Sequence, residues 1–120
     1  MSKARETTRL PKDAMPLDEM ASFRKNTTGV DHTIFISPKG NAQHGCRIKV
    51  AIDPPDTLNP RRRGISVQVA DYQVIGDTKR VSLGLLDQVR RFIDLNRDVL
   101  LEYWEYRIST GELVDRLRKI

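Results

Sequence analysis

The chain has one cysteine, two histidines and no long apolar run, and each shortage excludes a class of protein. A single cysteine, Cys46, cannot build an internal disulfide framework, which fits the reducing cytoplasm. A membrane span needs roughly 20 consecutive apolar residues, and no stretch approaches that length. No apolar run follows the basic residues near Met1, so we expect no secretory signal. These absences predict a cytoplasmic protein without a membrane anchor.

Histidine and cysteine are too few to form a metal centre by themselves. A closed zinc site takes about four ligands, whereas the chain offers two histidines and one cysteine. A carboxylate such as Asp31 would have to join His32, His44 and Cys46 to complete such a site. The glycines are isolated and form no phosphate-binding loop. We therefore predict no metal ion and no cofactor.

The length suits one domain with its own hydrophobic core. A chain of 120 residues can bury such a core without disulfides or metals. Only 38% of the residues are apolar, however, and 31% are charged, so part of the chain is expected to stay unpacked. Residues 1–12 hold four Lys or Arg residues against Glu6 alone, which predicts a flexible basic arm. Residues 13–120 are predicted to form a single domain.

Positive charge is concentrated in the first two thirds of the chain. Residues 1–30 sum to +2 and residues 31–80 to +3, whereas residues 81–120 carry seven charges of each sign. Any attraction to phosphates or acidic partners should therefore act upstream of residue 81.

A short helix is expected to begin at Pro16, a residue that the first turn of a helix tolerates well. Leu17, Met20 and Phe23 would then share one face, and Gly29 would end the helix. After this point the composition changes to β-branched and aromatic residues, which favour strands.

Alternating apolar residues and turn signals predict a small antiparallel sheet of three or four strands. The expected strands are residues 33–37, 47–52 and 65–69, with residues 72–75 as a fourth. The first two are expected to form a hairpin with a loose connection. Proline is excluded from central strand positions, so residues 54–64 are predicted to form a long exposed loop.

The C-terminal region carries the periodicity of amphipathic helices, which would cover one face of the sheet. The apolar stripe consists of Leu85, Leu86, Val89, Phe92, Ile93, Leu100, Tyr103, Trp104 and Ile108. Asn96 either lies buried on this stripe with a partner for its amide or caps a second helix; we favour a break there. Ser109 and Glu112 form a capping-box pattern that begins a final short helix. The predicted fold class is therefore α+β.

Residues 92–104 resemble the C-terminal signature of a family of small uncharacterised bacterial proteins. The shared pattern is an amphipathic helix, a short polar break, then two leucines and a tryptophan, here Leu100, Leu101 and Trp104. The upstream hairpin of residues 32–52 is similar to theirs in outline, and with it the resemblance covers about a third of the chain. Members of that family often carry several histidines near the first strand, whereas this chain has His32 alone there. The resemblance implies an α+β fold in a bacterial cytoplasmic protein and implies no activity.

Basic side chains in the middle of the chain are the best functional lead. Three adjacent guanidinium groups repel one another, and an anionic partner would relieve that repulsion. The candidate binding residues are Arg61, Arg62, Arg63, Arg47, Lys49, Lys79 and Arg80. We expect a non-enzymatic binding or adaptor module that uses this basic loop and the exposed edge of the hairpin, where Lys49 would discourage unwanted strand pairing.

Three alternatives remain open from the residues alone. Nucleic acid is one kind of partner for the basic loop, although only Tyr72 lies where a base could stack. A small enzyme is another hypothesis, with His32, His44, Cys46 and Asp31 as its reactive groups. A homodimer is the third, formed through a strand edge or through spare apolar surface of the C-terminal helices.

Overall fold

The computed structural model describes residues 20–120, in which the chain forms a five-stranded sheet and three helices. The strands are β1 (Ala21–Phe23), β2 (Ile34–Ile36), β3 (Arg47–Asp53), β4 (Arg63–Gln68) and β5 (Val74–Ile75). The helices are α1 (Lys25–Thr28), α2 (Leu83–Trp104) and α3 (Thr110–Arg116). The arm predicted for residues 1–12 and the start of the helix predicted from Pro16 lie outside the described residues.

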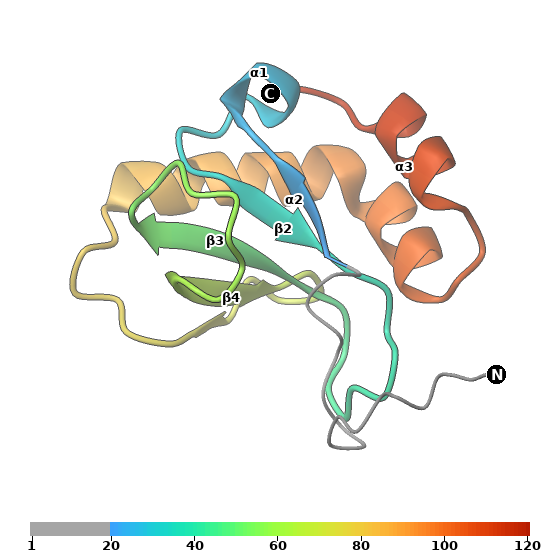
Figure 1. Ribbon diagram of the computed structural model, residues 1–120, viewed down its shortest axis with the longest axis horizontal. Helices are drawn as coiled ribbons and strands as arrows, with labels where there is room; N and C mark the ends of the chain where they lie inside the picture. The colour runs from blue at the N-terminus through green and yellow to red at the C-terminus, as the bar shows by residue number, and fades with distance from the viewer. Residues whose placement is uncertain (1–19) are drawn as a thin grey trace, which may run out of the picture.

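The sheet follows chain order from β1 to β5, and every neighbouring pair of strands is antiparallel (Figure 1). The predicted α+β class with an antiparallel sheet is confirmed. The expected hairpin is formed by β2 and β3, with Ile34 opposite Val50 and Phe35 opposite Lys49. Antiparallel neighbours need only short connections. Each strand of this sheet therefore pairs with the strand that follows it along the chain.

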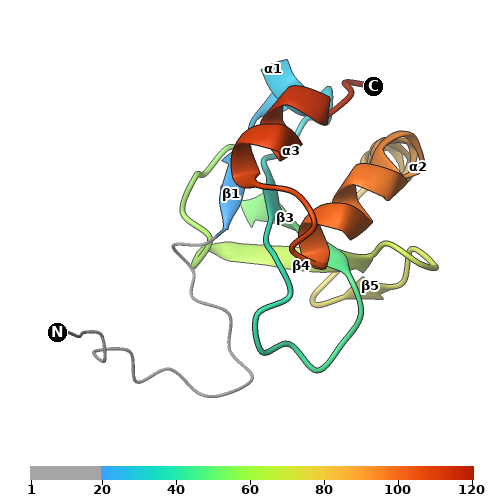
Figure 2. The same ribbon diagram turned by 90° about the vertical axis from the view of Figure 1, so that its right-hand side faces the viewer.

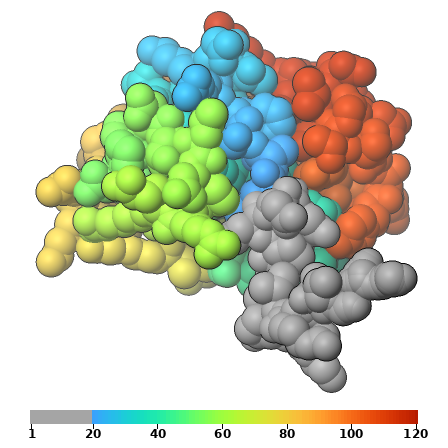
Figure 3. Space-filling view, in the orientation of Figure 1, coloured from blue at the N-terminus to red at the C-terminus, as the bar shows by residue number. Residues whose placement is uncertain are grey.

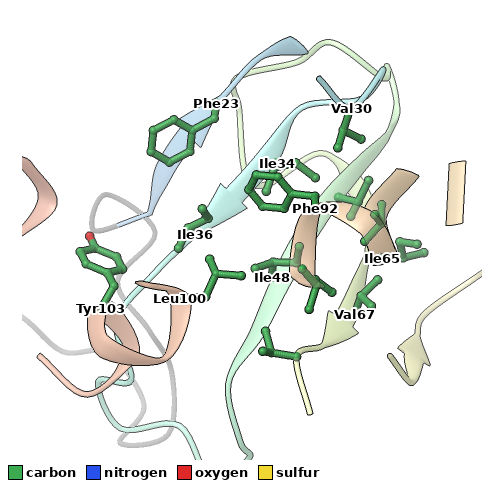
Figure 4. Packing of buried hydrophobic residues seen from close by; sticks show 14 of the residues in the cluster. Phe23, Val30, Ile34, Ile36, Ile48, Ile65, Val67, Phe92, Leu100 and Tyr103 are labelled. Atoms are coloured by element: carbon green, nitrogen blue, oxygen red, sulfur yellow. The ribbon is translucent and has the colours of Figure 1, made fainter. Parts of the chain in front are cut away.

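One face of the sheet packs against α2, which crosses it as a single long helix (Figures 1 and 2). Register places Ile34, Val50 and Ile65 side by side across three strands, and all three are buried. Figure 4 shows Phe92 beside Ile34 in the resulting core. Burying one such side chain stabilises a fold by about 1.5–3 kcal/mol. The prediction that C-terminal helices cover one face is confirmed for α2.

The strand count differs from the prediction because residues 21–23 form β1 rather than a helix. Ala21, Ser22 and Phe23 pair with β2 at the edge of the sheet. Only the four residues of α1 are helical in this region, and Gly29 ends that helix in the left-handed conformation, with φ 83°. The helical interpretation of residues 21–23 is therefore wrong, whereas the role of Gly29 as helix terminator is confirmed.

Asn96 does not break the C-terminal helix, contrary to the prediction. It is fully buried in the middle of α2, and its Nδ2 donates to the carbonyl oxygens of Phe92 at 3.0 Å and Arg118 at 2.9 Å. Its Oδ1 accepts from the backbone amide of Arg118 at 2.7 Å. A buried amide is tolerated when its donors and acceptor have partners, and Phe92 within α2 and Arg118 after α3 supply them here.

The chain returns over the end of α2 through α3. Ser109 and Glu112 form the predicted capping box, with reciprocal bonds of 3.1 and 2.8 Å. Leu113 is buried, and the amide of Ile120 donates to the carbonyl oxygen of Thr28 at 3.0 Å, which joins the segment after α3 to α1. Among residues 20–120, no helix combines the length with the apolar character that crossing a bilayer requires.

The other face of the sheet, turned away from α2, is called the open face below. Phe35 and Ala51 lie on it, but both are buried. In Figure 1 the light-green loop between β3 and β4 lies in front of the sheet on this side, and in Figure 3 its atoms form part of the surface there. The hairpin has no exposed edge, because β1 pairs with β2 and β4 pairs with β3. The prediction of a free hairpin edge is therefore wrong, and the outermost strands are β1 and β5.

Candidate functional site

The loop of residues 54–62 is shaped by short-range hydrogen bonds. Thr57 Oγ1 accepts from the amide of Asn59 at 3.0 Å, and Asn59 Oδ1 accepts from the amide of Arg61 at 3.0 Å. The carbonyl oxygen of Asn59 accepts from the amide of Arg62 at 3.1 Å. Such side-chain turns are typical of Asn and Thr in loops. They hold the backbone that presents the exposed side chains of Arg61 and Arg62.

Lys49 fastens this loop to the sheet. It lies on the central strand β3, faces the open face, and donates from Nζ to the carbonyl oxygen of Pro60. Burial lowers the pKa of the Lys49 amine, because removal from water disfavours its charged form. The expectation that Lys49 protects an exposed strand edge is wrong, and its observed contact holds the loop in place.

Five of the predicted basic residues gather where β3 ends and β4 begins. We call this cluster the basic end, and its members are Arg61, Arg62, Arg63, Lys79 and Arg80. Arg63 begins β4 rather than belonging to the loop. Figures 1 and 3 show the yellow connection between β5 and α2 beside the light-green loop, which brings the two basic segments together.

Two of these five cations are paired with carboxylates. Arg63 forms an ion pair with Asp77, and Arg80 lies 3.6 Å from Asp53. Both pairs join residues 76–82 to the β3–β4 end of the sheet. The other three, Arg61, Arg62 and Lys79, form no ion pair within the described part of the chain. The basic end therefore presents excess positive charge to solvent.

Arg47 lies apart from the basic end. It begins β3, opposite Gln68, whereas the basic end adjoins the far end of the same strand. A strand rises about 3.4 Å per residue, so roughly 20 Å of β3 separates Arg47 from Asp53. Burial lowers the pKa of the partly buried Arg47 guanidinium. The structure thus brings five of the seven predicted cations together, places Lys49 beneath the loop, and leaves Arg47 elsewhere.

The residues of the enzyme hypothesis do not meet. His32 Nδ1 lies 2.7 Å from the carbonyl oxygen of Ala51, near the end of β3, while His44 and Cys46 precede the start of β3. Asp31 is engaged by Lys25 at 2.8 Å. Within residues 20–120, no three His, Cys, Asp or Glu side chains come together as a metal site. Within the described residues, His32, His44, Cys46 and Asp31 therefore form no joint site.

Cys46 is held in an unreactive environment. Its Sγ lies 3.8 Å from the carbonyl oxygen of Leu100, and burial, reinforced by the negative charge of Glu105, raises the thiol pKa to about 12. His44 stacks at a tilt on Trp104, with ring centroids 5.6 Å apart, and its Nδ1 lies 2.8 Å from the carbonyl oxygen of Gly45. A nucleophilic cysteine needs a lowered pKa, so this pair lacks the required activation.

Tyr72 is occupied by contacts with α2. The guanidinium carbon of Arg90 lies 4.3 Å from the centroid of the Tyr72 ring. The Tyr72 hydroxyl donates to Asp94. Arg97 donates to the same hydroxyl at 3.0 Å. The hydrogen bond to Asp94 raises the pKa of Tyr72, and the same bond lowers the pKa of Asp94. The ring expected to stack with a base instead anchors the β4–β5 turn.

A groove that no sequence pattern predicted lies between β5 and the first half of α2. It has a volume of about 290 Å³, and its wall includes Val74, Leu83 and Arg90. The signal in the sequence was Leu83, which precedes Leu86 by almost one helical turn and so extends the apolar stripe. Leu83 is 85% exposed.

Comparison of the chain with protein families, curated proteins and solved structures finds no match. The resemblance of residues 92–104 to small bacterial proteins therefore stays an expectation. The function has to be argued from the chemistry of the basic end and of the surfaces beside it.

Proposed function

We propose that this protein is a non-enzymatic binding module that holds an acidic partner protein at the basic end. The observation that carries the proposal is the pair of adjacent exposed arginines, Arg61 and Arg62, which form no ion pair within residues 20–120. Like charges placed side by side repel each other, and carboxylates of a partner would relieve that repulsion. The ordered loop backbone reduces the entropy lost when the partner binds.

Carboxylates within the basic end favour a protein partner over nucleic acid. Asp53 and Asp77 neutralise two of the five cations and would repel a continuous phosphate backbone. Base stacking would require an exposed aromatic ring near the basic end, but Phe35 is 1% exposed and Tyr72 is engaged by Arg90. The ring of Tyr106 is 61% exposed but follows the far end of α2. Nucleic acid remains the alternative partner, supported by Arg61, Arg62 and Lys79.

The enzyme alternative draws less support from the geometry. His32 and Cys46 lie toward opposite ends of β3, and the thiol pKa is raised rather than lowered. A binding module should keep its affinity in a Cys46→Ser variant, whereas a cysteine-dependent enzyme should lose its activity in that variant.

Binding of labelled polyglutamate by fluorescence anisotropy tests the proposal. The double variant Arg61→Glu, Arg62→Glu should lose most of the affinity, because it reverses both unpaired cations of the loop. The matched control Arg107→Glu, Lys119→Glu changes net charge equally but lies outside the basic end, so it should retain most of the affinity. Equal losses in both variants would mean that overall charge alone attracts the probe, and would contradict a site at the basic end.

A further inference from the structure

The groove between β5 and α2 has an apolar floor and an open side. Val67 and Val89 are buried within it, while Val74 and Leu86 are partly exposed. Figure 2 shows β5 beneath α2 at the margin of the sheet. A volume of about 290 Å³ is enough for one or two apolar side chains of a ligand. The groove therefore combines an apolar hollow with the edge of a sheet.

The backbone of β5 is available for a further strand. Within residues 20–120, β5 pairs with β4 on one side only. The amide of Gln68 donates to the carbonyl oxygen of Gln73 at 2.9 Å, and hydrogen-bonded pairs alternate along an antiparallel ladder. The next pair, Val67 opposite Val74, is therefore a non-hydrogen-bonded pair. The amide and carbonyl of Val74 point away from β4, toward an incoming strand.

Leu83 marks the helical rim of the groove. It is 85% exposed in the first turn of α2, so it contributes little to the core. Covering an exposed apolar side chain beside an apolar hollow removes it from water and therefore favours binding of a ligand. The groove thus has an apolar contact on each side, Val74 from the strand and Leu83 from the helix.

Positive charge flanks the groove and identifies the chemistry of its occupant. Arg90 lies in the groove wall beside Tyr72, and Lys79 belongs to the connection between β5 and α2; neither side chain forms an ion pair within the described residues. The wall also holds one carboxylate, Asp87, which is paired with Arg91 at 3.1 Å, so the cations stay in excess. An extended segment with acidic residues on both sides of an apolar one would match this arrangement.

We propose that an acidic, extended segment of a partner protein adds as a strand to the outer edge of β5, with an apolar side chain in the groove. This inference rests on the proposed function, since it takes the partner to be acidic, and it adds where and how the partner binds. Strand addition supplies main-chain hydrogen bonds through Val74, and the groove supplies the preference for an apolar side chain.

The test uses a fluorescein-labelled synthetic peptide in which glutamate and valine alternate, and a lysine-for-glutamate peptide as its control. Leu83→Glu should weaken binding of the acidic peptide by about tenfold or more, because it removes an apolar contact and adds repulsion. Val74→Pro should also weaken binding, since it removes the outward amide without breaking a bond to β4. Val114→Glu, at a 49% exposed position on α3, is the matched control and should leave affinity unchanged.

Amide NMR of the unaltered protein with the same peptide keeps the result independent of any folding defect in the variants. Shifts at Val74 and Ile75, with slowed hydrogen exchange at the outward amide of Val74, would support strand addition. Shifts confined to residues 59–63, with no effect of Leu83→Glu, would overturn it and leave the proposed function standing. Failure of both this peptide and polyglutamate to bind would overturn both proposals. Concentration-dependent shifts at β5 without peptide would assign the edge to a second copy and overturn the peptide model.

Discussion

Asn96 is a polar side chain buried in the apolar stripe of α2, and its partners explain why that helix continues. The sequence allowed either a buried amide or a helix cap at this position. The choice depended on Arg118, whose backbone amide and carbonyl both bond to Asn96. That contact crosses 22 residues of sequence, so local reasoning at Asn96 could not foresee it.

Replacing Asn96 with leucine should destabilise the protein. The substitution leaves the partly buried amide and carbonyl of Arg118 without their partner, and an unsatisfied buried group costs about 1–3 kcal/mol. Urea unfolding should therefore show a loss of roughly 1–3 kcal/mol, since water can reach part of this site. Arg118→Ala keeps the backbone groups and is the control; it should cost less than about 1 kcal/mol. An unchanged midpoint for Asn96→Leu would contradict the bonding described here.

Cys46 should react slowly with alkylating reagents in the folded protein. Its pKa is raised from 9.0 to about 12, so the thiolate fraction at pH 8 falls by about a thousandfold. Mass spectrometry after iodoacetamide treatment should show little modification in native buffer and rapid modification in urea. Equal rates in the two conditions would mean that the thiol is exposed or activated.

The same shift gives a pH dependence of stability with a definite sign. Above pH 9 the thiol ionises in the unfolded chain while the folded chain keeps it protonated up to about pH 12. This group therefore contributes less stability as pH rises through that interval. Comparing Cys46→Ala with the parent protein isolates the contribution, because the variant lacks the titrating thiol.

At the scale of elements, the strands that alternate clearly were predictable and β1 was not. The segments that became β2, β3 and β4 carry β-branched residues between turn signals, so local pattern sufficed. Met20 and Phe23 have helical spacing, yet residues 21–23 pair with β2. Strand pairing with a segment farther along the chain overrides a weak local preference, and a three-residue strand carries too few residues to show alternation.

Gly29→Ala should destabilise the junction between α1 and the end of the chain. Gly29 has φ +83°, and an added Cβ would lie 2.7 Å from both Cγ1 and the carbonyl oxygen of Ile120. The left-handed conformation alone costs roughly 1 kcal/mol for alanine, and the clash adds to it. Thermal unfolding of Gly29→Ala should therefore begin at a lower temperature.

Gly45→Ala provides the matched control for that prediction. A Cβ at Gly45 would meet nothing within 4 Å, so its melting temperature should stay near that of the parent protein. Equal melting temperatures for the two variants would contradict the close approach of Ile120 to Gly29.

At the scale of the whole molecule, the cations of the candidate site were predictable by type but not by position. Arg61 and Arg62 stood out as a run, whereas the approach of Lys79 and Arg80 depends on how β5 returns beside β4. The groove was harder to foresee, because it is formed by residues from β4, β5 and α2. Such a surface exists only once the sheet and helix have packed.

Weak, salt-dependent binding of DNA is expected from the charge distribution. In a plot of log K against the logarithm of salt concentration, each neutralised phosphate contributes about −0.9 to the slope. Three cations of the basic end lack ion pairs within residues 20–120 and can neutralise phosphates. Anisotropy of labelled random-sequence duplex DNA should therefore give a slope of roughly −3. The variant Arg61→Glu, Arg62→Glu, Arg63→Glu should abolish this binding, because it replaces attraction by repulsion.

Random-sequence RNA in the same titration discriminates between the two partner classes. Since Phe35 is buried and Tyr72 is engaged by α2, no ring of the open face is expected to stack with bases. Single-stranded RNA should then bind no more tightly than duplex DNA at equal salt. Tighter RNA binding that persists at high salt would reveal contacts beyond phosphate attraction, and would favour a nucleic-acid partner over an acidic protein.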